Sequence, residues 1–186
     1  MFASAAIVWT CSVAVAQRPV VCPQEYLDLR AINEIGRAAS CNTIDSAFRH
    51  VVAPDAVTKL IYAAQRVRRC PGAKSDELLI GNLPSDEVTF SLLYSLTFPS
   101  EVVQIEKSVD ELASGLWLEL ALDAVIRQGR GARAFLMQSY LGSSNADIGE
   151  MFPDLNAELR RRAPKTFASA FRALPRTAKQ YVRTSP

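Results

Sequence analysis

The sequence has a single histidine in 186 residues, and this scarcity excludes most familiar catalytic sites. His50 lies between Arg49 and Val51 with no nucleophile motif nearby. A Ser-His-Asp or Cys-His site needs a partner group for its histidine, and this segment offers none. We therefore predict a surface or core-edge role for His50. We also predict no enzymatic activity, no metal site, no cofactor and no small-molecule substrate.

Cysteine is also sparse, and its spacing matches neither a zinc motif nor a Cys-x-x-Cys redox motif. Two interpretations stay open. In a reducing compartment the cysteines are small buried apolar residues. If export removes the first sixteen residues, three cysteines remain and one disulfide, such as Cys41 to Cys70, can form. The four cysteines are Cys11, Cys22, Cys41 and Cys70.

The apolar run over residues 3–16 is shorter than the roughly 20 residues that a membrane-spanning helix needs. It ends in Ala14-Val15-Ala16, a pattern typical of the small-residue cleavage site of a secretory signal. No Lys or Arg precedes Arg18, so the basic start of a signal peptide is missing. We treat residues 1–16 as an apolar N-terminal segment that is either signal-like or retained, and we expect no membrane partner.

Strand patterns are lacking, because alternation of β-branched or aromatic residues is never sustained, whereas helical spacing recurs throughout. The hydrophobic content of 49% is enough for one core of ordinary size. The sequence therefore predicts one all-α domain of short helices. One apolar series has clear helical spacing after Pro54-Asp55 and stops at Pro71-Gly72: Val57, Leu60, Ile61, Ala64 and Val67.

Other helix starts are predicted from Pro23, from Asn42 or Thr43, and from serines that acidic residues follow. The last of these serines, with Glu at the third helical position, predicts a capping box. Further short helices are predicted over 135–141, 145–152, 155–163 and 166–174, with Pro153 and Pro164 between them. The serine starts are Ser75, Ser85, Ser100 and Ser108.

A helix over Leu112–Ile126 is apolar almost all round, which is typical of the centre of a domain. Its polar stripe consists of Glu119, Asp123 and Arg127 at four-residue spacing, and Gly129 is the candidate C-cap. We expect Arg127 and a neighbouring helix to satisfy the two carboxylates.

Short helices with brief connections favour helical pairs stacked as in an α-solenoid. Two similar segments, Leu60–Ala64 and Leu92–Leu96, lie 32 residues apart after Pro-Asp-type starts, and Ala31–Arg37 resembles a degenerate earlier copy. Over residues 24–128 the chain resembles organelle helical-repeat proteins of the FAST-kinase and octotricopeptide groups. That resemblance implies a role in organelle RNA metabolism or in the organelle ribosome.

Charge divides the chain unevenly. Residues 1–126 carry 10 basic and 15 acidic side chains, whereas residues 127–186 carry 11 basic and four acidic ones. We therefore distinguish an acidic helical-repeat core over 17–129 from a basic helical C-terminal region over 130–186. The basic residues of this region recur at helical spacing, as one continuous face that would suit phosphate binding. The residues expected to bind RNA are Arg160, Arg161, Arg162, Lys165, Arg172, Arg176, Lys179 and Arg183.

These features predict a non-catalytic subunit of a larger assembly, such as a mitochondrial ribonucleoprotein or ribosome, with protein partners and RNA on its basic face. Alternatively, the basic face is solvated or docks on an acidic protein surface. The second prediction for the whole chain is an exported helical binding module, periplasmic or secreted, with one disulfide.

Overall fold

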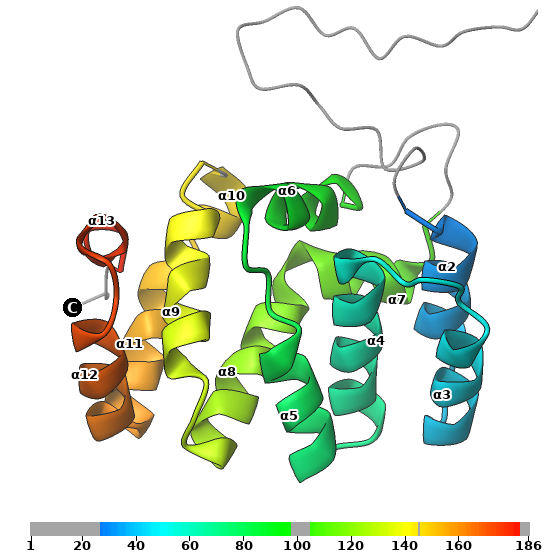
Figure 1. The fold of residues 1–186 in the computed structure, drawn as a ribbon, viewed down its shortest axis with the longest axis horizontal. Helices are drawn as coiled ribbons and strands as arrows, with labels where there is room; N and C mark the ends of the chain where they lie inside the picture. The colour runs from blue at the N-terminus through cyan, green and yellow to red at the C-terminus, as the bar shows by residue number, and fades with distance from the viewer. Residues whose placement is uncertain (1–26, 98–104, 145, 183–186) are drawn as a thin grey trace, which may run out of the picture.

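A computed structural model describes residues 27–97, 105–144 and 146–182 (Figure 1). All regular structure in these residues is helical, and none of them lies in a strand, so the all-α prediction is confirmed. The elements are α2 (Leu29–Arg37), α3 (Cys41–Arg49), α4 (Ala56–Arg69), α5 (Ala73–Gly81), α6 (Glu87–Ser95), α7 (Lys107–Glu111), the π-helical segment η1 (Leu112–Leu116), α8 (Trp117–Gln128), α9 (Ala132–Leu141), α10 (Ala146–Gly149), α11 (Phe152–Arg162), α12 (Pro164–Arg172) and α13 (Arg176–Lys179).

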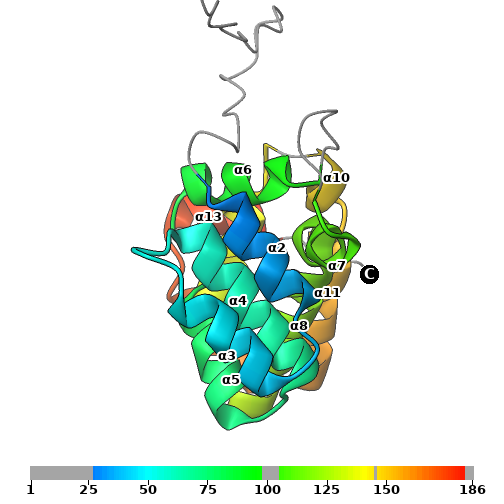
Figure 2. The same ribbon diagram turned by 90° about the vertical axis from the view of Figure 1, so that its right-hand side faces the viewer.

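Most of the helices follow one another in chain order along the long axis of the molecule, but α7 lies back beside α2 and packs on it (Figure 1). α4 packs on α2 and α3, α5 packs on α4, and α8 packs on both α4 and α5. Beyond α8 come α9 and α11, and then α12, which packs on both. α6 interrupts this sequence, because it lies across the ends of its neighbours in both views (Figures 1 and 2). The serial order suits stacked helical pairs, and the solenoid form stays a prediction.

The centre of the core is α8, as the apolar pattern predicts. Trp117, Leu118 and Val125 are fully buried there, and α8 ends at Gly129 in the left-handed conformation with φ 65°. The predicted single helix over 112–126 is wrong in its first turn, because the backbone widens into η1 and Gly115 adopts φ 137°. Only glycine adopts such a conformation readily.

Aspartates cap α4 and α6: the start at Asp55 is as the sequence predicts, whereas α6 is capped by Asp86 and not by the predicted Ser85. The side chains of Asp55 and Asp86 each accept a hydrogen bond from a backbone N–H three residues later, at the starts of α4 and α6. α3 starts differently from the prediction, since Ser40 is its cap and forms a reciprocal capping box with Thr43. Asn42 is already inside the helix.

Two serines that were predicted to cap helices make tertiary hydrogen bonds instead. The Ser75 hydroxyl donates to the carbonyl oxygen of Cys70 (2.7 Å), and the Ser108 hydroxyl donates to that of Gly36 (2.8 Å). Both lie inside the first turn of helices that begin earlier, so the predicted capping box at Ser108 is wrong. The start predicted at Ser100 lies outside the described residues.

Two prolines that were predicted to lie between helices begin helices instead. Pro153 and Pro164 occupy the first turns of α11 and α12, where the missing N–H costs no intrahelical bond. Pro23 and residues 1–16 lie outside the described residues. α2 begins only at Leu29, after Asp28, whose carboxylate accepts from the N–H of Ala31 (3.0 Å).

Candidate functional site

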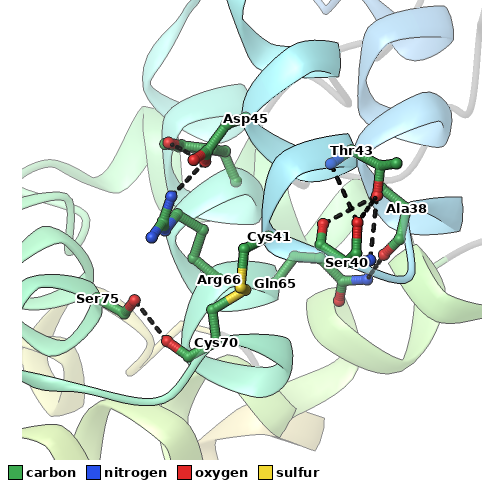
Figure 3. Close-up of a disulfide and its surroundings, with 10 residues drawn as sticks. Ala38, Ser40, Cys41, Thr43, Asp45, Gln65, Arg66, Cys70 and Ser75 are labelled. Carbon is green, nitrogen blue, oxygen red and sulfur yellow. Dashed lines mark hydrogen bonds and ion pairs between the residues drawn. A yellow bond between two sulfur atoms is a disulfide. The ribbon is translucent and has the colours of Figure 1, made fainter.

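A disulfide joins Cys41, the first residue of α3, to Cys70, the residue after α4 (Figure 3). The two Cα atoms are 5.8 Å apart although the residues are 29 positions apart in the sequence. Because α3 and α4 are consecutive helices that pack together, the start of one meets the end of the other. The bond therefore closes the α3–α4 hairpin at its open end. The interpretation of Cys41 and Cys70 as free, buried residues is therefore wrong, and the bridge named as the alternative is present.

The backbone on both sides of the disulfide is held by hydrogen bonds (Figure 3). The carbonyl oxygen of Cys70 accepts from Ser75, and its N–H donates to the carbonyl oxygen of Arg66 (2.7 Å). On the other side, the fully buried Gln65 amide donates to the carbonyl oxygens of Gly36 (3.0 Å) and Ala38 (3.1 Å). These contacts fix the α2–α3 connection against α4, so the two cysteines are positioned independently of their own bond.

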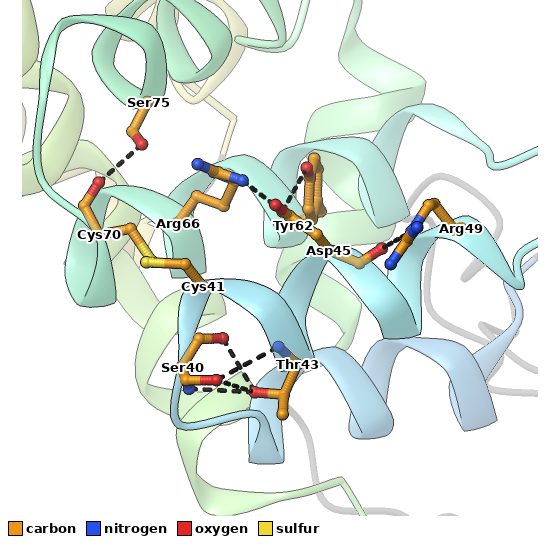
Figure 4. A network of polar contacts seen from close by, with 9 residues as sticks. All are labelled: Ser40, Cys41, Thr43, Asp45, Arg49, Tyr62, Arg66, Cys70 and Ser75. Carbon is orange, nitrogen blue, oxygen red and sulfur yellow. Dashed lines mark hydrogen bonds and ion pairs between the residues drawn. A yellow bond between two sulfur atoms is a disulfide. The ribbon is translucent and has the colours of Figure 1, made fainter.

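A cluster of polar side chains lies further along the same hairpin (Figure 4). The Tyr62 hydroxyl donates to a carboxylate oxygen of Asp45 (2.9 Å), Arg66 forms an ion pair with the same carboxylate, and Phe48 stacks on the Tyr62 ring at 3.9 Å between centroids. The Arg66 hydrogen bond lowers the pKa of Asp45. Burial, followed by the hydrogen bond to Asp45, raises the pKa of Tyr62. At neutral pH the carboxylate stays ionised and the phenol stays protonated, so the cluster is suited to holding α3 on α4 and not to transferring protons.

His50 is exposed at the end of α3, and its Nδ1 atom lies 2.6 Å from the carbonyl oxygen of Ser46 one turn earlier. Among the described residues, no group of three histidine, cysteine or acidic side chains is placed to hold a metal ion. No helix of the described chain is both long and apolar enough to cross a bilayer.

The polar stripe of α8 is satisfied by partners that the sequence did not suggest. Arg127 forms two hydrogen bonds with Asp76 of α5 (2.9 and 2.7 Å), and the Asp76 side chain is only 2% exposed. Asp123 pairs instead with Arg162 of α11 (2.8 Å), and Glu119 is exposed. The expectation that a neighbouring helix helps to satisfy the stripe is confirmed for Asp123, whereas the pairing expected of Arg127 is wrong, because the end of α8 lies against α5. The Arg127 hydrogen bond lowers the pKa of Asp76.

The predicted basic face is distributed over three helices rather than along one. Arg160, Arg161 and Arg162 end α11, and a turn at Ala163 separates them from α12. α13 is a further short helix that packs on α9 (Figure 1). Breaks at residues 163 and 173–175 therefore prevent a continuous helical face. Lys165 and Arg172 are in α12, Arg176 and Lys179 are in α13, and Arg183 lies outside the described residues.

Three of these seven described basic side chains are occupied within the protein, and the other four form no ion pair with a described acidic residue. Arg161 forms an ion pair with Glu158 (2.6 Å), and Arg162 forms one with Asp123. Lys179 donates a hydrogen bond to the carbonyl oxygen of Arg172 (3.0 Å). Its ammonium nitrogen lies 5.9 Å from the centroid of the Phe171 ring. The exposed side chains that form no ion pair with a described acidic residue are Arg160, Lys165, Arg172 and Arg176.

Two aromatic side chains lie between these charges, Phe167 and Phe171. Their rings stack on each other with centroids 5.9 Å apart, and both side chains are partly buried against the core. They therefore contribute to holding α12 in place.

No family model, curated protein or solved structure matches the chain. The resemblance to organelle helical-repeat proteins consequently stays a prediction.

Proposed function

We propose that the protein is a non-catalytic helical binding module that works in an oxidising compartment, either periplasmic or extracellular. The Cys41–Cys70 bond is the observation that supports this proposal. Disulfides persist in exported proteins, whereas thiol-reducing systems keep cytosolic cysteines reduced. The apolar segment over residues 3–16, which ends in small residues, is compatible with export of the chain.

The polar side chains of the α3–α4 hairpin support binding rather than catalysis. A general acid or base works best when its pKa lies near the working pH. The Arg66 hydrogen bond moves the pKa of Asp45 away from neutrality, and burial moves that of Tyr62 away in the opposite direction. Both groups are used to fix two helices together, which preserves the shape of a binding surface.

Export can be tested with the full chain carrying alkaline phosphatase after Pro186, because this reporter is active only where its own disulfides form. We expect enzymatic activity from a bacterial host expressing this fusion. The matched control replaces Ile7 and Val8 with arginine, which interrupts the apolar run, and its activity should be at background level. Background activity from the unmodified fusion, with the fusion protein present in the cell, would contradict the export proposal.

A second candidate function is supported by the four exposed basic side chains that lack an ion pair. In this proposal the protein is a subunit of an organelle ribonucleoprotein and contacts RNA phosphates with α11, α12 and α13. Each phosphate neutralised on a single strand contributes about 0.7 to the slope of log K against log salt. Four contacts therefore account for a slope of about 3.

RNA filter binding over a salt series separates the two candidates. The test variant has alanine at Arg160, Lys165, Arg172 and Arg176. If these side chains bind phosphates, the affinity of the variant should depend less steeply on salt, with a slope that is smaller in magnitude by about 3. A control variant has alanine at Lys59 and Arg69, two exposed basic residues of the acidic part of the chain. Equal slopes for the wild type and both variants would leave the RNA proposal without support.

A further inference from the structure

An open pocket of about 320 Å³ lies on the surface beside α9. Its volume is at the lower end of the range for small-molecule sites. Three separate parts of the chain form its walls: the α5–α6 connection, α9, and the residue before α13 (Figure 1). They contribute Leu83, Pro84 and Ser85, then Arg133, Ala134, Met137 and Leu141, and finally Pro175.

The walls of this pocket are held in place by contacts outside it. The Gln138 side chain is fully buried, and its amide donates to the carbonyl oxygens of Pro84 and Ala134, both at 2.9 Å. The rings of Tyr140 and Tyr181, on α9 and just after α13, lie 5.5 Å apart. The pocket is therefore formed before any ligand arrives, which reduces the entropic cost of binding.

The residues that line the pocket are mostly apolar, and Arg133 is the one charged residue among them. Leu83 and Leu141 are buried, and Met137 is a partly buried thioether that can adapt to the shape of a ligand. Arg133 lines the pocket and is exposed, and it forms no ion pair with any described acidic residue. Two of the three walls belong to residues 127–186, which carry 11 basic and only four acidic side chains, whereas Ser85 of the third wall donates a hydrogen bond to Asp86 (3.3 Å). An anionic group beside Arg133 would therefore have a favourable charge partner.

We propose that this pocket binds a free amphiphilic carboxylate, such as a medium-chain fatty acid. The hydrocarbon chain lies on Leu83, Met137 and Leu141, and the carboxylate accepts hydrogen bonds from the Arg133 guanidinium. A guanidinium can bind a carboxylate through two parallel hydrogen bonds. A concave pocket of this size suits one free chain better than the flat surface of a bilayer. The proposal goes beyond the binding module proposed above and does not depend on the compartment.

Isothermal titration calorimetry of the full chain with sodium decanoate tests this site. We expect saturable binding of one decanoate per chain, weakened about tenfold or more in Arg133→Gln because a charge-assisted hydrogen bond is lost. The matched control is Arg69→Gln, an exposed arginine at the end of α4 outside the pocket, which should bind like the wild type. Decyltrimethylammonium has the same chain with the opposite charge and should bind at least tenfold more weakly. Absence of saturable decanoate binding, or equal affinity for the two amphiphiles, would overturn the proposal.

A steric variant tests the location of the site independently of charge. Ala134 is an exposed position on α9 that lines the pocket, so Ala134→Trp should fill the pocket without entering the core. We expect loss of decanoate binding with an unchanged melting temperature, whereas Ala168→Trp on the exposed side of α12 should leave binding intact. Wild-type affinity in Ala134→Trp would overturn the assignment of the pocket. Sedimentation with phosphatidylglycerol vesicles in the absence of decanoate binding would also overturn it, in favour of a lipid surface.

Discussion

Replacing both Cys41 and Cys70 with serine should lower the stability of the fold substantially. The disulfide joins residues separated by 29 positions. For a closed loop of that length, the loss of denatured-state entropy corresponds to about 3.6 kcal/mol at 25 °C. Cys41 is exposed and Cys70 only partly buried, so the serine side chains themselves should cost little packing. Most of the loss should therefore come from the missing cross-link.

Urea denaturation followed by circular dichroism measures this loss. With a typical m-value of about 2 kcal/mol per molar urea, the midpoint should fall by about 1.8 M in the double variant. Reduction of the wild type should lower its midpoint by a similar amount, whereas the double variant should not respond to reductant. A midpoint change below about 0.5 M, or an equal response of both proteins to reductant, would show that the hairpin does not depend on the bond.

The remaining predictions concern one partly buried ion pair and two glycines. The hydrogen bonds from Arg127 lower the pKa of the Asp76 carboxylate in the folded state. Asp76 therefore stabilises the fold at pH values above its unfolded pKa of about 3.9. This stabilisation is lost as the pH falls through the lower, folded-state pKa. Asp76→Asn should therefore destabilise the protein by about 1 to 2 kcal/mol at pH 7 and by much less in acid. The expected loss at pH 7 is modest because Arg127 is half exposed and solvent screens the pair. Thermal melts of both proteins at pH 7 and pH 3 measure the difference, and an unchanged difference would contradict the pairing. Gly115→Ala should cost about 1 to 3 kcal/mol, because φ is 137° and the added Cβ would lie 2.7 Å from Met151 atoms. Gly81→Ala, with no heavy atom within 4 Å of the added Cβ, should be neutral or slightly stabilising in the same urea assay.

Periodicity made the existence of the main helices predictable. In α4 each apolar position of the predicted series, such as Val57, Leu60 and Val67, is buried. Helix boundaries were less predictable, because a serine before acidic residues has two uses. It can cap a helix, or it can form a tertiary hydrogen bond as Ser75 and Ser108 do. Local sequence does not distinguish these cases, since the deciding carbonyl group belongs to another element.

The contacts of the candidate site were harder to predict from the sequence, because they join residues that are far apart in the chain. Arg127 and Asp76 are 51 positions apart, whereas the helical spacing in α8 suggested partners four positions apart. The Cys41–Cys70 pairing likewise depends on α3 and α4 lying side by side. The basic residues of the C-terminal region were identified, but their distribution over three helices depends on the turns near Ala163 and Pro175.

The central claim is that this is an exported protein with the Cys41–Cys70 bond in place. Mass spectrometry of the full-length native protein, with free thiols alkylated during lysis, tests both parts in one measurement. The account predicts a mature chain beginning at Gln17, with the Cys41 and Cys70 peptides linked to each other. A chain that begins at Met1 and carries alkyl groups on both cysteines would contradict the account.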